Sequence, residues 1–193
     1  MRAFIAIPCQ DELKDKILNF QDQIKNFGKI KLVEKENIHL TLKFLGDVDE
    51  NKIKDIIEIL NSISNNKNNK NNNKNNKKFE INLCGIGAFP DENYIKILWV
   101  GVSSGSEEIS SLQQQIDEQL KILNFKKEKK FHPHFTIARV KFLNSRNKGE
   151  LQRVLKENSD TDFGEFEVCG FQLMKSELTS SGPIYSVIKF FEF

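Results

Sequence analysis

The sequence has 193 residues, a length that suits one domain or two small lobes that share a core. With 38% hydrophobic and 29% charged residues and no apolar run near the roughly 20 residues that cross a bilayer, we expect a soluble globular protein without a membrane partner. The formal net charge is +2, but five lysines fall in the tract 65–78, which leaves −3 elsewhere. So little positive charge argues against a protein that tracks long duplex nucleic acid.

The cysteines indicate the compartment. Cys9, Cys84 and Cys169 are an odd number without metal-type spacing, which favours packed thiols in a reducing environment. The N-terminus MRAFIAIP lacks the long apolar stretch and cleavage site of a signal peptide. We therefore expect a cytoplasmic protein.

Apolar periodicity predicts a mixed succession of strands and helices. In the first half they are a strand at 2–7, a helix at 11–27, a strand at 35–45 and a helix at 49–63. The Asn- and Lys-rich tract 65–78 has no apolar residue, so it cannot offset the entropy of ordering it and is predicted to be a disordered insertion. It is either inert or a basic arm that steers RNA.

The second half continues the pattern after this tract. We predict strands at 79–87 and 95–102, a helix at 107–123, a strand at 134–140, a helix at 148–156, and strands at 166–178 and 185–191. The predicted elements thus mix strands and helices in both halves of the chain.

The two halves repeat one order of elements. Each has a strand with a His-x-Thr motif, a helix, a strand that begins FEI or FEV, a proline turn and a final apolar strand. The motifs are His39 and Thr41 in HLTLKFLG, and His134 and Thr136 in HFTIARV. A duplicated unit packs most simply about a pseudo-two-fold axis, so we expect one bilobal domain over residues 1–193.

Side chains alternate between the two faces of a strand, so His39, Thr41 and Lys43 should share one face, and His134 and Thr136 should share a face of the other strand. If the apolar faces are buried, both histidine-threonine faces line one cleft. A neutral imidazole can accept a proton while a protonated one donates, and hydroxyls can donate hydrogen bonds to phosphate oxygens. The pattern therefore predicts acid/base cleavage of a phosphodiester.

No carboxylate cluster accompanies these residues, so we expect no metal ion and no cofactor. His132 lies two residues before His134 and could mimic a metal-binding pair, but no third ligand is evident and Pro133 disturbs the strand. His132 is instead a candidate for a charged neighbour that tunes His134.

Three more side chains are candidates for substrate binding. Lys43 shares the predicted cleft face, with an exposed strand lysine as the alternative. Strict alternation points Arg139 away from the cleft, and on that outer face it would pair with an acid. A β-bulge could instead turn its side chain toward the substrate phosphate. Tyr185 follows a Gly-Pro turn and could stack on a base or pack in the core.

HLTLKFLG and HPHFTIARV resemble the two signature motifs of the two-histidine phosphoesterase superfamily. Within it, the chain is most similar to the RNA 2′,3′-cyclic 3′-phosphodiesterases, also called 2′-5′ RNA ligases. The likeness runs from RAFIAI near the N-terminus to SELTSSGPIYSVIKFFEF at the C-terminus. It implies an α+β fold with two antiparallel sheets that flank a central cleft, and helices on the outside.

The resemblance also implies an activity and roles. The reaction is the opening of a terminal 2′,3′-cyclic phosphate to a 2′-phosphomonoester. His39 would donate a proton to the leaving 3′ oxygen, His134 would accept one from the attacking water, and Thr41 and Thr136 would hold the phosphate oxygens. The residues alone do not orient these roles, because the two halves are nearly symmetric.

Three other functions stay open from the sequence. Ligation uses the same acid/base pair in reverse, a binding module could hold a nucleotide phosphate without reaction, and a structural protein could bury both histidines. Two titrating groups argue against the binding module, since arginines would bind phosphate more tightly and at every pH. We expect an RNA terminus or a nucleoside cyclic phosphate as the partner, and a monomeric protein.

Overall fold

The computed structural model describes residues 1–65, 77–128, 130–180 and 182–193. Its first half holds β1 (Arg2–Pro8), α1 (Asp11–Ile24), β2 (Lys29–Leu32), β3 (His39–Asp47) and α2 (Lys52–Ser64). Its second half holds β4 (Phe79–Asp91), β5 (Tyr94–Val102), α3 (Ser106–Leu120), β6 (His134–Phe142), α4 (Ser145–Glu157), β7 (Asp162–Val168), β8 (Gly170–Leu178) and β9 (Pro183–Glu192). The predicted disordered insertion falls almost entirely outside the described residues.

The described strands form one antiparallel sheet of nine strands in the order β7-β4-β5-β6-β3-β1-β8-β9, with β2 paired to β6 off this path. The two motif strands, β3 and β6, lie at the centre with three strands on either side, as a two-fold repeat requires. The α+β class is confirmed. The resemblance implies two antiparallel sheets, and in the structure these join into one sheet because β3 and β6 pair at Leu40 and Phe135.

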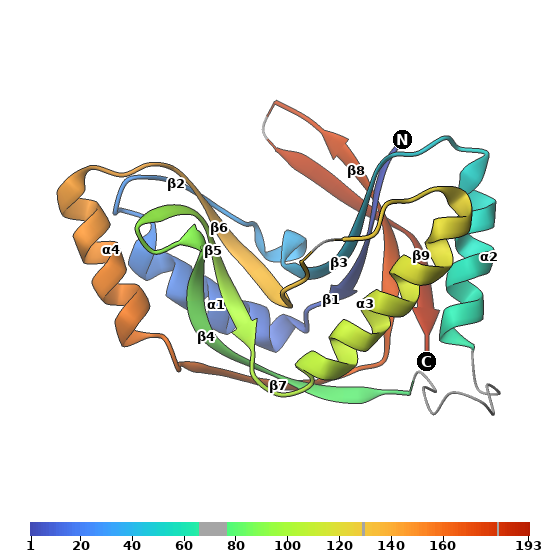
Figure 1. Cartoon of the computed structure of the whole chain (residues 1–193). Helices are drawn as coiled ribbons and strands as arrows, with labels where there is room; N and C mark the ends of the chain where they lie inside the picture. The colour runs from blue at the N-terminus through green and yellow to red at the C-terminus, as the bar shows by residue number, and fades with distance from the viewer. Residues whose placement is uncertain (66–76, 129, 181) are drawn as a thin grey trace.

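The helices divide between two lobes. In Figure 1, α1 and α4 lie at one end of the molecule, and α2 and α3 lie at the other. α1 packs against β6 and β7, whereas α2 packs against β9 and α3 against β3. The buried face of α1 carries Leu13, Ile17, Phe20 and Ile24, which recur at helical spacing.

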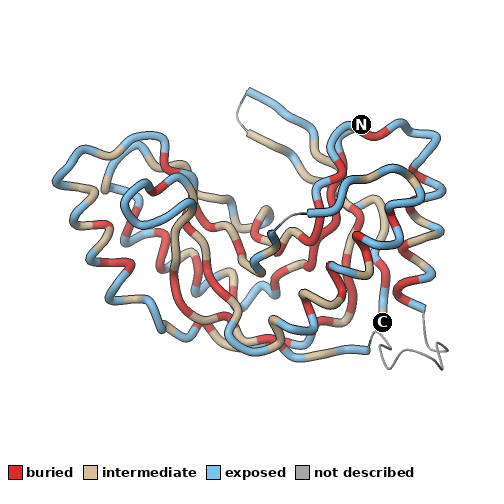
Figure 2. The backbone as a smooth tube through the Cα atoms, viewed as in Figure 1, coloured by how far each residue is buried: buried red, intermediate tan, exposed pale blue. Residues whose placement is uncertain are grey.

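The core lies between the sheet and these helices. Figure 2 shows buried residues along the central strands and on the inner faces of the helices. Ile5, Leu40, Phe135 and Phe171 are fully buried. Each such side chain contributes about 1.5–3 kcal/mol through burial, so the core holds both motif strands in place.

Several element boundaries differ from the prediction, and two of the differences add or divide a strand. α1 ends at Ile24 rather than at residue 27, and the chain then forms the short strand β2, whose four residues carry too little pattern to predict. The predicted strand 166–178 is two strands, since β7 pairs with β4 and β8 pairs with β1. The chain crosses to the other half at Gly170, where a Cβ atom would lie 2.2 Å from the carbonyl oxygen of Phe191.

Candidate active site

Each motif strand carries a β-bulge at the same point. Across β1 and β3, Ile5 pairs with Lys43 and Ala6 with Thr41, which leaves Leu42 as the extra residue. Across β5 and β6, the extra residue between Thr136 and Ala138 is Ile137. The pattern of burial is therefore identical along the nine residues of both strands.

The bulges reverse the alternation of side chains beyond each threonine. Lys43 borders the cavity but does not lie open beside Thr41 as predicted; it is 2% exposed. Arg139 does not point away from the cleft as strict alternation predicts; it lines the cleft and is exposed. In both strands the residue after the bulge is buried and the next one faces the cleft.

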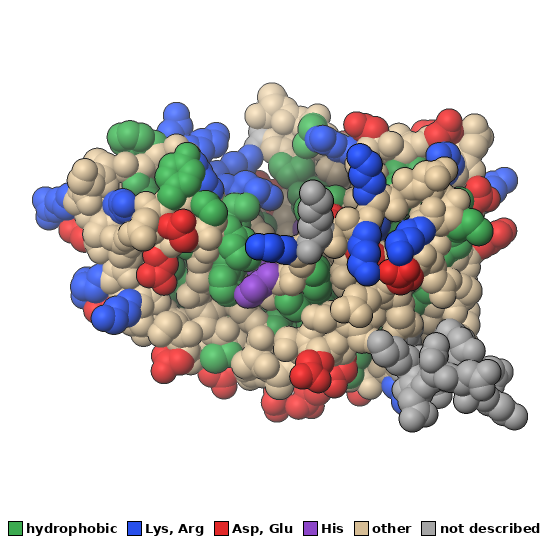
Figure 3. Space-filling view, in the orientation of Figure 1, with side chains coloured by type: hydrophobic (Ala, Val, Ile, Leu, Met, Phe, Trp, Pro, Cys, Tyr) green, Lys and Arg blue, Asp and Glu red, His purple; other side chains and the backbone are tan. Residues whose placement is uncertain are grey.

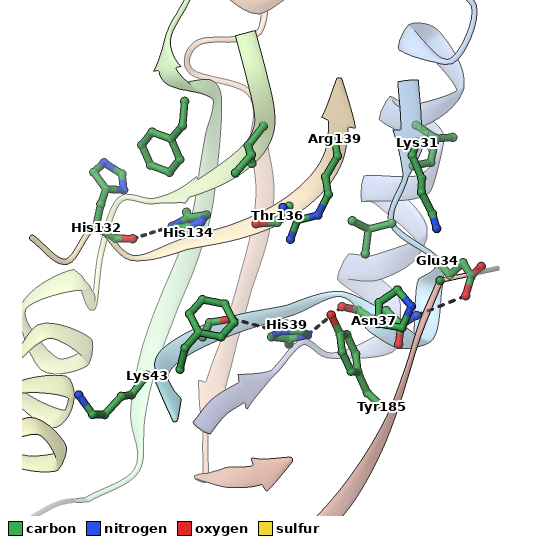
Figure 4. Close-up of a pocket in the computed structure, with 18 of the residues that line it drawn as sticks. Lys31, Glu34, Asn37, His39, Lys43, His132, His134, Thr136, Arg139 and Tyr185 are labelled. Carbon is green, nitrogen blue, oxygen red and sulfur yellow. Dashed lines mark hydrogen bonds between the residues drawn. The ribbon is translucent and has the colours of Figure 1, made fainter. Parts of the chain in front are cut away.

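A cavity of about 890 Å³ lies between the two lobes, and both histidine-threonine pairs line it. Figure 3 shows a histidine in this hollow, with apolar side chains along its walls and basic ones beside it. Figure 4 shows His39 on β3 and His134 on β6 at facing positions. The structure thus brings together the four residues of the two motifs.

Four contacts hold the ring of His39. Its Nδ1 lies 2.8 Å from the carbonyl oxygen of Asn37, which only accepts hydrogen bonds, so Nδ1 carries the hydrogen. In the neutral ring Nε2 then accepts from the Thr41 hydroxyl at 3.1 Å. Phe4 stacks on the ring at 4.9 Å and Tyr185 meets it edge-on at 5.4 Å. These contacts leave the imidazole one orientation.

His134 is held in the equivalent way. Its Nδ1 lies 2.7 Å from the carbonyl oxygen of His132, two residues earlier, as Asn37 is two residues before His39. Phe89 meets its ring edge-on at 5.0 Å, and the ring of Trp99 lies at 6.2 Å. Both histidines therefore anchor Nδ1 on the backbone, which leaves Nε2 as the nitrogen for proton transfer.

Burial makes both imidazoles less basic than usual. Loss of solvent lowers the pKa of His39 to about 4, with smaller lowering by the charges of Arg139 and His134, while the hydrogen bond to Asn37 opposes the shift. Loss of solvent also lowers the pKa of His134, and the charges of His132 and Arg139 add to it. Both rings are therefore neutral at pH 7 in the empty cleft.

Lys43 forms a buried ion pair rather than a free cationic group in the cleft. Its ammonium donates to the carboxylate of Asp117 on α3 and to the carbonyl oxygen of Lys126 at 2.7 Å. The second oxygen of Asp117 accepts from the Gln113 amide at 2.8 Å and from the Glu128 backbone N–H at 3.0 Å. This network attaches β3 to the segment that leads into the second motif.

The other candidate residues line the same cavity. Arg139, His132 and Tyr185 all border it, and the charge of Arg139 acts on both histidines. Tyr185 is half-buried, with its ring 5.0 Å from that of Phe4 as well as beside His39. It therefore packs against the motif histidine while it lines the cleft.

Several residues of the site were missed in the sequence. Phe44 and Phe89 line the cavity, and Asn37 orients His39. Asp117 and Gln113 had a readable signal, since both interrupt the apolar stripe of α3 that runs from Ile109 to Leu120. A carboxylate in such a stripe requires a buried partner. No signal in the sequence marked Phe44, because whether its side chain faces the cleft depends on the bulge.

The described residues hold neither a metal-binding cluster nor a membrane span. No three histidine, cysteine or acidic side chains there gather into a set that could hold a metal ion. No helix in this part of the chain has both the length and the apolar character of a membrane span.

The chain was compared with known families and curated proteins. A family model described as the AKAP7 2′5′ RNA ligase-like domain matches residues 3–193. A protein of Methanocaldococcus jannaschii named RNA 2′,3′-cyclic phosphodiesterase is 44% identical over 189 residues, which cover 98% of this chain and 99% of that protein. One of the same name from Methanothermobacter thermautotrophicus is 34% identical over 192 residues, with 99% and 98% coverage.

Solved structures show the same fold. The crystal structure of the Thermus thermophilus protein TT0787 has a TM-score of 0.81 at 26% identity and covers 100% of this chain and 97% of that one. That of E. coli LigT complexed with 3′-AMP has a TM-score of 0.73 at 20% identity, with 99% and 97% coverage.

A bilobal α+β fold with one His-x-Thr pair on each of its two central strands defines a two-histidine phosphoesterase. The family model and the curated relatives agree with this class over nearly the whole chain. The chain belongs to the RNA 2′,3′-cyclic phosphodiesterase family of this superfamily.

Proposed function

We propose that this enzyme, an RNA 2′,3′-cyclic phosphodiesterase, hydrolyses a terminal 2′,3′-cyclic phosphate to a 2′-phosphomonoester by acid/base catalysis from His39 and His134, without a metal ion. The observation that carries the proposal is the pair of imidazoles, each fixed through Nδ1 and each lining one cleft from a central strand. Names of relatives, such as that from Methanocaldococcus jannaschii, support the substrate class.

The proposed reaction is an in-line displacement at phosphorus. Water attacks from one side while the 3′ oxygen leaves from the other, so acid and base must stand on opposite sides of the phosphate. His134 takes the proton of the water and His39 gives one to the leaving oxygen. The hydroxyls of Thr41 and Thr136, one on each strand, donate hydrogen bonds to the two non-bridging oxygens, and Arg139 offsets the negative charge.

Substrate binding also has to supply a proton to His39. In the empty cleft its pKa is about 4, so it is neutral at pH 7 and cannot act as an acid. The bound phosphodiester carries one negative charge, which favours the protonated imidazole beside it. We therefore expect the substrate to raise the pKa of His39 as it binds.

The function is tested with an RNA oligonucleotide that ends in a 2′,3′-cyclic phosphate. We expect hydrolysis at the same rate with and without excess EDTA, and a 2′-phosphomonoester as the product, identified by phosphorus NMR. Loss of activity in EDTA that returns with a divalent metal would contradict the metal-free reaction. A 3′-phosphomonoester would reverse the identity of the leaving oxygen.

The pH dependence follows from the direction of the pKa shifts. The reactive form of the enzyme has His39 protonated and His134 neutral. The pKa values of both histidines in the free enzyme lie below 6.5, so the reactive form becomes rarer as the pH rises above them. Since kcat/KM reports the free enzyme, it should peak below pH 6.5 and fall about tenfold per pH unit above the peak. The profile of kcat should lie at higher pH because bound phosphate raises the pKa of His39.

The pH profile of kcat is measured at saturating concentrations of a nucleoside 2′,3′-cyclic phosphate, and that of kcat/KM at low concentrations. An NMR titration of the His39 ring in the free protein should have its midpoint near pH 4. A kcat/KM optimum above pH 7, or a midpoint near the ordinary histidine value, would show that the empty cleft does not suppress protonation.

A further inference from the structure

The two motif strands share little backbone contact. β3 and β6 pair at Leu40 and Phe135, each one residue after a motif histidine. In the described part of the chain this is the one register pair between these strands, and the cavity opens beside it. Acid and base must keep a fixed separation across the phosphate. A second link between the halves would therefore bear on the reaction.

A buried ion pair forms such a link. Lys43 lies on β3, two residues after Thr41, and Asp117 lies on α3, in the second half of the chain. Figure 4 shows the Lys43 side chain reaching toward α3. Only 2% of the Lys43 side chain and 1% of the Asp117 side chain are exposed.

The bulged motif strand does not itself require this pair. The equivalent position on β6, the buried residue after the bulge, is Ala138. Ala138 is fully buried and brings no polar side chain into the core. A buried ion pair is also weak evidence for stability, since apolar side chains of similar volume often stabilise a fold at least as well. The pair of Lys43 and Asp117 therefore indicates a role other than filling the core.

Asp117 holds the backbone of the segment that leads into β6 at two points. Its carboxylate accepts directly from the Glu128 N–H at 3.0 Å. The second contact runs through Lys43, whose ammonium donates to the carbonyl oxygen of Lys126 at 2.7 Å. Residues 126–128 are exposed and belong to no helix or strand. Since such residues have little packing of their own, these backbone contacts define where they lie.

The position of this segment reaches the active site within a few residues. Glu128, Phe131 and His132 line the cavity. The carbonyl oxygen of His132 lies 2.7 Å from Nδ1 of His134 and so orients the motif imidazole. A displacement of the segment would therefore move the contact that aims His134.

We propose that Asp117 is a positioning residue for the reaction, a proposal that rests on the function given above. It does not contact the substrate. It acts through the Glu128 N–H and through Lys43, and so fixes the approach to His134 relative to the strand that carries His39. A misplacement of about 1 Å far from the chemistry can cost about 10²-fold in rate.

Two double variants separate the hydrogen bonds of Asp117 from its charge. Lys43→Met with Asp117→Asn and Lys43→Met with Asp117→Leu both remove the ion pair, but only asparagine keeps an oxygen that can accept from the Glu128 N–H. For a nucleoside 2′,3′-cyclic phosphate, kcat should fall about 100-fold in the leucine variant and less than about threefold in the asparagine variant. KM should change by less than about threefold in both, because a misplaced base weakens the transition state rather than substrate binding.

A second readout does not depend on turnover. The Nδ1 hydrogen of His134 is held by the carbonyl of His132, and that of His39 by the carbonyl of Asn37. In the leucine variant, the His134 hydrogen should exchange with water faster while the His39 hydrogen keeps its wild-type rate. NMR of protein with ¹⁵N-labelled histidine measures both rates. A general loss of fold would instead expose both hydrogens alike.

An exposed ion pair at the same place provides the matched control. Lys127 lies in the same segment and pairs with Glu118 of α3 at 2.9 Å, with both side chains 51% exposed. Lys127→Met with Glu118→Gln should change neither kcat nor the two exchange rates, because an exposed pair contributes little.

Equal kcat in the two double variants, whether high or low, would overturn the proposal, and so would equal exchange at both histidines in the leucine variant. If that variant does not fold, Glu128→Pro removes the same N–H with the ion pair intact, and it should show the same loss relative to Glu128→Ala. Failure of the wild type to open a cyclic phosphate would instead contradict the proposed function, and the exchange rates would still decide the role of Asp117.

Discussion

Replacing either motif histidine with alanine should lower kcat for a 2′,3′-cyclic phosphate by about 10³-fold. A positioned general acid or base contributes about 10²- to 10⁴-fold, and neither imidazole has a substitute at its position. Single-turnover rates with a nucleoside 2′,3′-cyclic phosphate measure the loss for His39→Ala and His134→Ala. Because the two residues act in one displacement, their losses should not add, and the double variant should resemble the slower single one.

His132→Ala is the matched control for these variants. Its ring also lines the cavity, 6.2 Å from that of His134, but the contact that orients His134 is made by the carbonyl of His132, which alanine keeps. We expect a far smaller loss of rate than for either motif histidine. Motif variants that keep wild-type turnover but bind nucleotide poorly would favour a binding module over an enzyme. Circular dichroism of each variant separates loss of catalysis from loss of fold.

Lys43→Met should lower the free energy of unfolding by about 3–5 kcal/mol, because it leaves the carboxylate of Asp117 buried without its charged partner. Both side chains are almost completely buried, at 2% and 1% exposure. The double variant Lys43→Met with Asp117→Leu should recover most of the loss, because it removes both charges and keeps the volume filled. Urea denaturation of the wild type and of the two variants measures the effect.

The exposed pair of Lys35 and Asp15 is the control for this prediction. Lys35→Met should leave the urea midpoint almost unchanged, because water solvates the charge that remains. If Lys43→Met is equally neutral, the buried pair does not stabilise the fold. If the double variant is no more stable than Lys43→Met, the loss comes from packing and not from the unpaired charge.

Most of the fold was predictable because it depends on local patterns. Period-two alternation marks β3 and β6, a continuous apolar run marks β1, and helical spacing marks α1 and α3. The short strand β2 and the break between β7 and β8 were not predictable in this way. The first is too short to carry a period, and the second depends on which strand each segment pairs with.

The two His-x-Thr pairs, their duplication and the strands that carry them could all be read from spacing along the chain. Which side chains beyond the threonines face the cleft depends instead on how the strands pair in the folded protein. A β-bulge is a property of two paired strands, so the shifts opposite β1 and β5 turn Lys43 inward to Asp117 and Arg139 outward into the cavity. The low pKa of His39 likewise depends on burial, which residues distant in the chain provide.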